Sequence, residues 1–270
     1  MFCDTHCHLD FDVYDADRQE VVERARAAGI AFIINPGIDL ESSQKALQLT
    51  LRYPGFIYAA VGIHPNYVGT CAENTLPDLR ILAQTPGVVA IGEIGLDYYR
   101  HYADPAQQRQ VFLQQLELAS GMQLPVVIHD RDASQDLVPI LTDWYHGLPA
   151  ESLLKQHPGD LHAYSDNLEI ALPLAELGFC FGIGGPITYQ NAEERRQVAA
   201  GLPPDKILLE TDAPFLTPHP YRGKRNEPAY IPLMAAELAK LHGKTDGEIG
   251  QITTATAATL FSLKLPGKPA

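Results

Sequence analysis

Two histidines one residue apart close the first apolar run of the chain, in the segment Asp4-Thr5-His6-Cys7-His8. If this run is a β-strand, the alternation of side chains places Asp4, His6 and His8 on one face. Both imidazoles can then reach one point, and neutral imidazole is a good ligand for borderline divalent metals. Asp4 is placed to orient a ring by accepting its hydrogen bond. The spacing therefore predicts a metal site rather than a polar surface turn.

Other apolar runs also end in residues that could bind metal. These residues are His64, Glu93, His129, His162, Glu210 and Asp212. One such residue at a strand end is usually only solvated, but this repetition at several strand ends indicates a shared site. Carboxylates and imidazoles without a required thiolate suit Zn, Mn or Mg, and a carboxylate can bridge two ions.

Short apolar runs alternate with longer amphipathic stretches along the whole chain. The predicted strands are residues 1–8, 31–36, 56–63, 88–94, 125–129, 160–162, 179–183 and 207–211. The predicted helices are residues 18–28, 40–53, 75–84, 105–122, 133–145, 167–177, 192–200, 228–242 and 245–261. Strands separated by helices favour parallel pairing through right-handed crossovers.

This pattern predicts an α/β fold of the (β/α)8 TIM-like barrel type, because such barrels need about 250 residues. We expect a single domain over residues 1–263, followed by a short tail at residues 264–270. An open doubly wound sheet is the alternative, but the glycine-rich turn that usually follows its first strand is missing here. In a barrel the carboxyl ends of the strands carry the chemistry, which is where the histidines and carboxylates lie.

Composition limits the class of protein. The chain has 270 residues, 46% of them apolar, and 20 basic against 33 acidic residues give a net charge of −13. This charge argues against a protein that coats nucleic acid through its overall field, but it permits an enzyme with local cations. Four scattered cysteines and the lack of a signal-like start predict a cytoplasmic protein. No apolar stretch approaches the roughly 18 residues of a membrane span, and no obligate protein partner is inferred.

Five segments carry a resemblance to a known family. Residues 4–10, 62–65, 92–99, 210–214 and 220–229 read DTHCHLD, GIHP, GEIGLDYY, ETDAP and PYRGKRNEPA. In this order they resemble the motifs of the TatD family of metal-dependent hydrolases, and they extend over nearly the whole chain. The resemblance implies an amidohydrolase-type barrel that binds two or three divalent metal ions. It also implies a deoxyribonuclease that hydrolyses phosphodiester bonds of DNA, and of RNA, commonly from the 3′ end.

The resemblance further implies roles for individual residues. His6, His8 and Asp212 would bind one metal, Glu93 would bridge both, and His129 and His162 would bind the other. The predicted catalytic residues are Asp212, Glu93 and His64, with Asp212 taking the proton of a metal-activated water. His64 and Arg222 match positions near the substrate phosphate. Glu210 would join an additional metal or, like Asp4, support a ligand from behind.

Two further expectations concern loops. Many relatives read His-Cys-Phe-Ser-Gly where this chain has His162-Ala-Tyr-Ser165-Asp166, and we expect Asp166 or Ser165 to cap the following helix. Arg222, Lys224 and Arg225 form a basic cluster beside Asp212, and we expect these side chains to contact phosphate.

Two other functions remain open at this point. The same metals could activate water for attack on another ester or amide, such as that of a D-aminoacyl-tRNA, and fold and ligands do not separate these reactions. A metal-binding scaffold without catalysis is the second alternative, and the presence of Glu93 and Asp212 speaks against it.

Overall fold

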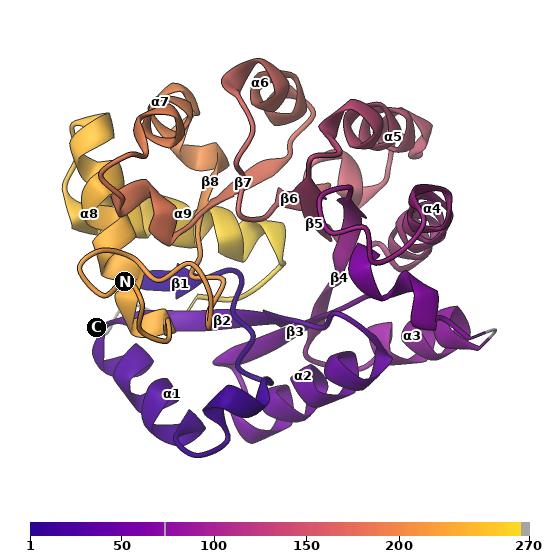
Figure 1. Ribbon diagram of the computed structural model, residues 1–270, viewed down its shortest axis with the longest axis horizontal. Coiled ribbons are helices and arrows are strands. Elements are labelled where there is room, and N and C mark those ends of the chain that lie inside the picture. Colours follow the sequence, from indigo (N-terminus) through magenta and orange to yellow (C-terminus); the bar gives the residue numbers. More distant parts are fainter. Residues whose placement is uncertain (73, 266–270) are drawn as a thin grey trace.

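A computed structural model describes residues 1–72 and 74–265. Its eight strands are parallel and follow one another in chain order around a nearly closed barrel (Figure 1). The strands are β1 Phe2–Asp4, β2 Ile30–Pro36, β3 Ile57–Val61, β4 Val88–Asp97, β5 Val126–Arg131, β6 Gly159–Leu161, β7 Cys180–Ile183 and β8 Ile207–Leu209. The predicted fold class is therefore confirmed.

Helices alternate with the strands and surround them. They are α1 Arg18–Ala27, α2 Leu40–Arg52, α3 Thr75–Ala83, α4 Pro105–Met122, α5 Ser134–Gly147, α6 Leu168–Glu176, α7 Glu193–Gly201, α8 Ile231–His242 and α9 Asp246–Leu260. Capping side chains fix several helix starts, since Asp39 accepts from the backbone of Ser42, and Thr245 accepts from that of Glu248. Among the described residues, none of the helices combines the length and hydropathy that crossing a bilayer requires.

Backbone hydrogen bonds close the barrel between its first and last strands. The amide of Thr5 donates to the carbonyl of Leu209 at 3.0 Å, and the amide of Asp212 donates to that of His6 at 2.8 Å. The amide of His8 donates to the carbonyl of Ala213, also at 2.8 Å. These bonds hold the segment after β1 against the segment after β8.

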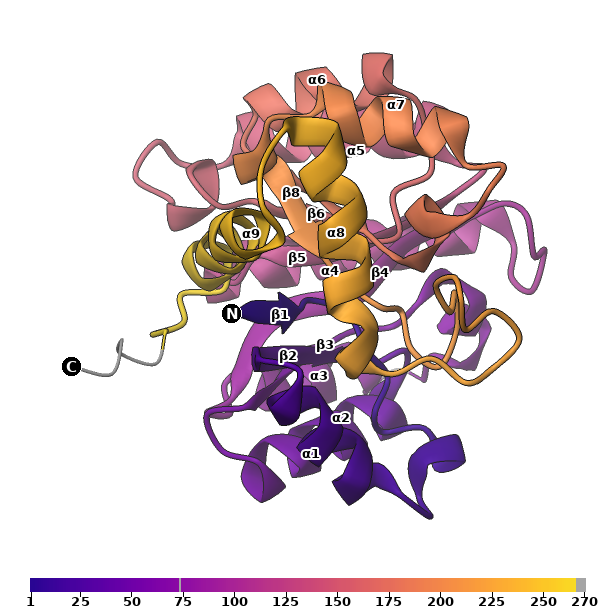
Figure 2. The same ribbon diagram turned by 90° about the vertical axis from the view of Figure 1, so that its left-hand side faces the viewer.

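One end of the barrel is closed by apolar packing. Strand residues such as Phe32, Val127 and Leu208 form a buried cluster there. Ala257 in α9 and Phe261 directly after this helix belong to the same cluster. The β1 arrow points away from α9 and toward the loops that follow β1 and β8 (Figure 2). Ligands must therefore approach from the carboxyl ends of the strands.

Several strand boundaries differ from the predicted ones. β1 ends at Asp4, because the chain beyond it pairs only through an isolated bridge between Cys7 and Ala213. β4 extends to Asp97, because its second half pairs with β5 as far as Arg131. His6 and His8 thus lie beyond β1, and the barrel-closing hydrogen bonds rather than a continuous strand hold them.

Candidate metal centre

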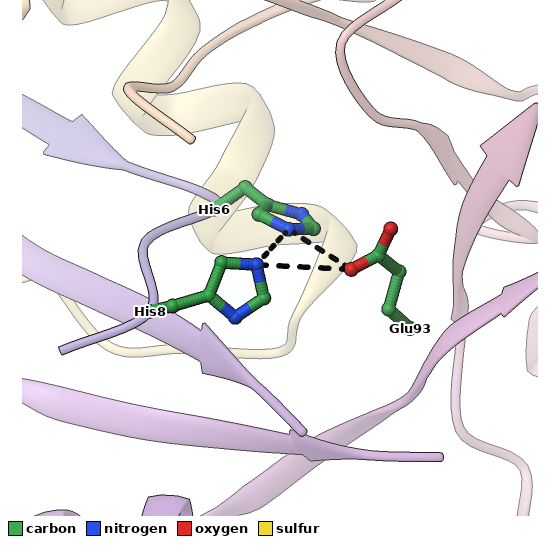
Figure 3. Close-up of side chains that lie close together, drawn as sticks. All are labelled: His6, His8 and Glu93. Carbon is green, nitrogen blue, oxygen red and sulfur yellow. Dashed lines mark hydrogen bonds and ion pairs between the residues drawn. The ribbon is translucent and has the colours of Figure 1, made fainter. Parts of the chain in front are cut away.

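His6 and His8 face each other at the open end of the barrel. Their Nε2 atoms are 3.2 Å apart, and both side chains are buried. Oε2 of Glu93, from β4, lies 3.4 Å from Nε2 of His6 and 3.8 Å from Nε2 of His8 (Figure 3). Three atoms able to bind a metal therefore converge, although the three residues come from two distant parts of the chain.

The other oxygen of Glu93 faces a second group of imidazoles. Its Oε1 lies 2.9 Å from Nδ1 of His129, 2.8 Å from Nε2 of His162 and 3.4 Å from Nε2 of His64. Glu93 thus separates two groups of histidines, with one carboxylate oxygen directed at each. A carboxylate placed in this way could bridge two metal ions.

Asp212 completes the first group. Its Oδ1 lies 3.7 Å from Nε2 of His8 and 3.9 Å from Nε2 of His6, and it also forms a possible ligand set with His6 and His162. The backbone of Asp212 has φ 52°, in the left-handed region that few non-glycine residues adopt. Burial raises the pKa of Asp212 to about 6.

Asp97 fixes the orientation of His129. Its Oδ2 lies 3.3 Å from Nε2 of His129, and Oε1 of Glu93 lies 2.9 Å from Nδ1 on the other side of the ring. Burial lowers the pKa of His129, but hydrogen bonds to Asp97 and Glu93 outweigh it and raise this pKa. A metal ion bound at Nδ1 would displace the proton there, and Asp97 would accept the proton that stays on Nε2. Burial opposes ionisation of Asp97, but hydrogen bonds from His129 and from the backbone of Arg100 outweigh it and hold its pKa well below the usual range. Sequence reasoning missed Asp97, although it ends the GEIGLD segment of β4.

His64 has the opposite hydrogen-bonding arrangement. Its Nδ1 accepts from the backbone amide of Asn66 at 3.0 Å, so the proton of the neutral ring lies on Nε2. Burial lowers the pKa of His64 to about 3, which keeps the ring neutral. Distance alone would group His64 with Glu93 and His129 as ligands, but its tautomer makes Nε2 a hydrogen-bond donor.

The imidazole nitrogens and carboxylate oxygens of this cluster face one another, and a bound cation would stabilise their lone pairs. Nε2 of His6, Nε2 of His8 and Nδ1 of His129 all face the Glu93 carboxylate with little solvent around them. Burial alone would lower the pKa of His162, yet the charge of Glu93 reverses this and raises it well above normal. Buried lone pairs of imidazole and carboxylate suit divalent metals, so these residues fit a metal centre.

Glu210 lies behind His162 rather than among the ligands. It is fully buried, and its Oε1 accepts from the backbone amide of Ala163 at 2.6 Å and lies 3.8 Å from Nδ1 of His162. A side chain at Gly182 would collide with the Glu210 carboxylate, so this glycine makes room for it. Among the described residues, Glu210 belongs to no possible ligand set.

The prediction that Asp4 orients a histidine ring is wrong. Its Oδ2 accepts from the hydroxyl of Thr211 at 2.6 Å, and its Oδ1 accepts from the backbone amides of Thr211 and His6. Asp4 therefore joins the backbone after β1 to the backbone after β8. It positions His6 through the main chain.

The capping prediction for Asp166 and Ser165 is also wrong. Asn167 caps α6 by accepting from the amide of Ile170 at 3.0 Å. Asp166 instead contacts the hydroxyl of Ser134, which also lies 2.6 Å from Oδ2 of Asp130. These carboxylates line a cavity of about 140 Å³ that includes His162.

The predicted basic cluster is divided in the structure. Arg225 forms a two-pronged ion pair with Asp17, at 2.8 and 2.6 Å, so its charge is used within the fold. Arg222 is exposed and lies over the ring of Tyr189, with its guanidinium carbon 4.1 Å from the ring centre. Lys224 is also exposed. Arg222 and Lys224 therefore stay available to an anionic ligand, whereas Arg225 does not.

Comparison with known proteins agrees with this geometry. The profile of the family described as TatD related DNase matches residues 3–262. An uncharacterized metal-dependent hydrolase of Bacillus subtilis, YabD, is 40% identical over 97% of this chain and 100% of its own length. A 3′-5′ ssDNA/RNA exonuclease TatD of Erwinia tasmaniensis is 36% identical over 96% of this chain and 99% of its own.

The solved structures lead to the same family. The crystal structure of YjjV, a TatD homologue of Escherichia coli, superposes with a TM-score of 0.89. It is 34% identical, and the alignment covers 97% of this chain and 98% of that one. Because profile, relatives and structure agree over nearly the full length, this chain belongs to the TatD-related DNase family of metal-dependent hydrolases.

Proposed function

We propose that this protein is an exonuclease that removes nucleotides from the 3′ end of single-stranded DNA, and of RNA, with divalent metal ions. The observation that carries the proposal is Glu93, whose two oxygens face two separate groups of imidazoles. The relative from Erwinia tasmaniensis, a 3′-5′ ssDNA/RNA exonuclease TatD, supports the choice of substrate.

In this proposal the ligands divide into two sets around Glu93. His6, His8 and Asp212 would hold one ion, and His129 through Nδ1 and His162 through Nε2 would hold the other. When bound, such ions activate water and neutralise charge on the reacting phosphoryl group. In this arrangement Glu210 lies behind His162 and positions it, and the proposal includes no third metal ion.

The remaining roles belong to residues of the chain itself. Asp212, whose Oδ1 lies 3.7 Å from Nε2 of His8, takes the proton of the attacking water. The Nε2–H group of His64 donates to an oxygen of the scissile phosphate, because its tautomer and low pKa make it a neutral donor. Arg222 contacts a phosphate further along the strand.

The cysteines support a cytoplasmic location. Cys3, Cys7, Cys71 and Cys180 are all free thiols, as is usual where the compartment keeps thiols reduced.

The test is to follow a 5′-labelled single-stranded oligonucleotide incubated with protein and Mg, Mn or Zn. We expect shortening by one nucleotide at a time from the 3′ end, and much slower turnover of carboxylic esters, amides and D-aminoacyl-tRNA. Rapid hydrolysis of one of those substrates with an intact oligonucleotide would contradict the proposal.

A further inference from the structure

A groove of about 560 Å³ opens beside the metal ligands. It lies between the loops that follow β1, β2, β3 and β8, and its volume falls within the usual range of small-molecule sites. Three aromatic side chains, Phe11, Tyr67 and Phe215, line it. Phe215 is 53% exposed and Tyr67 is 38% exposed, so both present ring surface to a ligand.

The aromatic rings connect the groove directly to the metal centre. The ring of Phe11 stacks on His8, with 4.7 Å between centroids and 18° between planes. The ring of Tyr67 lies 6.1 Å from that of His64, and Phe215 lies 6.1 Å from Phe11. A flat group held by these rings would be adjacent to a bond placed at Glu93.

The charge of the groove selects against phosphate. Asp12 and Glu41 are exposed on its wall, and both are carboxylates. Lys45 is the one basic residue among the described residues that line the groove. Its Nζ lies 3.0 Å from Oε1 of Glu41 and 3.9 Å from Oδ1 of Asp12, so these carboxylates offset its charge. A phosphate in the groove would be repelled by these carboxylates, whereas an uncharged base and sugar would not.

Cations lie across the mouth of the barrel. Arg195, in the first turn of α7, lies 3.4 Å from the carbonyl of Tyr164, and Arg222 lies over Tyr189. The strand order places this side, near β6 and β7, opposite β2 and β3 (Figure 1). Both arginines are exposed, and in the described part of the chain neither forms an ion pair of the kind that holds Arg24 or Arg225.

We propose that the aromatic groove binds the terminal nucleoside of the substrate strand, with its base against Phe11, Tyr67 and Phe215. This inference rests on the proposed nuclease function and adds where the strand end lies. The phosphate that joins the terminal nucleoside to the strand then lies at the metal ligands, and the following phosphates extend toward Arg195 and Arg222. A strand that continued through the groove would carry phosphates past Asp12 and Glu41, so the groove selects chain ends.

The test compares two oligonucleotides that differ only at the 3′-terminal position, which is either a normal nucleotide or an abasic one. Stacking of one base contributes enough affinity for the wild type to prefer the normal end by about five-fold or more in kcat/KM. Phe215→Leu should lower this ratio, because the base then contacts only Phe11 and Tyr67, and Phe215→Tyr should restore most of it. Tyr102→Ala removes an exposed aromatic outside the groove and should leave the ratio as in the wild type.

A second arm tests the charge of the groove with an oligonucleotide that carries a 3′-terminal phosphate. The wild type should process this end more slowly than a 3′-hydroxyl end, and Asp12→Asn with Glu41→Gln should reduce the difference. Equal rates on normal and abasic ends in the wild type would overturn the inference while leaving the nuclease function intact. An equal loss of preference in Phe215→Leu and Tyr102→Ala would overturn it as well. Failure of the proposed function is distinguishable, because neither oligonucleotide would then be shortened.

Discussion

The Asp97 carboxylate and the His129 imidazole form a pair in which Oδ2 lies 3.3 Å from Nε2. The other oxygen of Asp97 accepts from the backbone amides of Tyr99 and Arg100, at 3.0 and 2.9 Å, so the carboxylate cannot turn away from the ring. His129 therefore presents Nδ1, and not Nε2, to the metal centre. A carboxylate behind a histidine ligand also raises the basicity of that ligand.

Replacing Asp97 by asparagine should weaken metal binding. The amide can still accept from Tyr99 and Arg100, but its nitrogen would then face Nε2 of His129 and favour the tautomer with the proton on Nδ1. We expect metal affinity to fall by about 10- to 100-fold, measured by titration of the apo protein with Zn or Mn. Turnover should recover at high metal concentration. An unchanged metal affinity would show that Asp97 does not support His129 as a metal ligand.

Removing the metal should abolish hydrolysis and leave the protein folded. The barrel has its own apolar interior, closed by α9, and does not depend on metal for a core. After chelation, circular dichroism should show the same helical content, with a lower melting temperature that rises again when metal is added. Full activity in a preparation shown by elemental analysis to be free of metal would contradict this expectation.

The histidines of the centre should differ from those elsewhere in their effect on turnover. His129→Ala and Glu93→Ala should reduce kcat at least as much as the roughly 10- to 100-fold expected for losing an outer partner. His146 is exposed, and its replacement should change stability by less than about 0.5 kcal/mol. Similar losses of turnover in His129→Ala and His146→Ala would contradict the assignment of His129 to the metal centre.

His242 lies outside the metal centre, but its side chain contacts another helix, so replacing it should affect stability and not turnover. Its Nε2 lies 3.0 Å from the carbonyl of Ala199, which it can join by a hydrogen bond between α8 and α7. His242→Ala should therefore lower the free energy of unfolding by about 0.5–1.5 kcal/mol and leave kcat unchanged. Denaturant unfolding and steady-state kinetics of the same preparation check both expectations.

Arg222 and Arg225 should separate binding from stability. Arg222→Ala should raise KM for an oligonucleotide and reduce the slope of log affinity against log salt by about 0.7. Arg225→Ala breaks a partly exposed pair with Asp17, so it should cost about 1 kcal/mol or less of stability and leave the salt slope unchanged. The reverse pattern would assign the phosphate contact to Arg225.

The strand ends could be predicted from the sequence because the relevant signals are local. Alternation near His6 and His8 and the apolar runs before Glu93 and His129 each lie within a few residues. Parallel strands then bring their carboxyl ends to one side of the barrel. This geometry follows from chain order alone and does not depend on details of side-chain packing.

The partners of individual polar groups could not be predicted in this way. Asp4 bonds to Thr211 and Arg225 to Asp17, across more than 200 residues in each case, and nothing local marks either pair. The cap of α6 falls on Asn167, where Ser165, Asp166 and Asn167 are all suitable residue types. The hydrogen-bond partners of His64 and His129 include Asn66 and Asp97, which only the fold brings to the rings.

The most direct test of the metal centre is anomalous diffraction from crystals loaded with Zn or Mn. We expect two peaks, one on each side of Glu93, with bonds of about 2.0–2.2 Å to Nε2 of His6 and His8 and to Nδ1 of His129. Nε2 of His64 should lie outside bonding distance of both. Peaks remote from Glu93, or a single ion bound through Nε2 of His64, would contradict the assignment of these ligands.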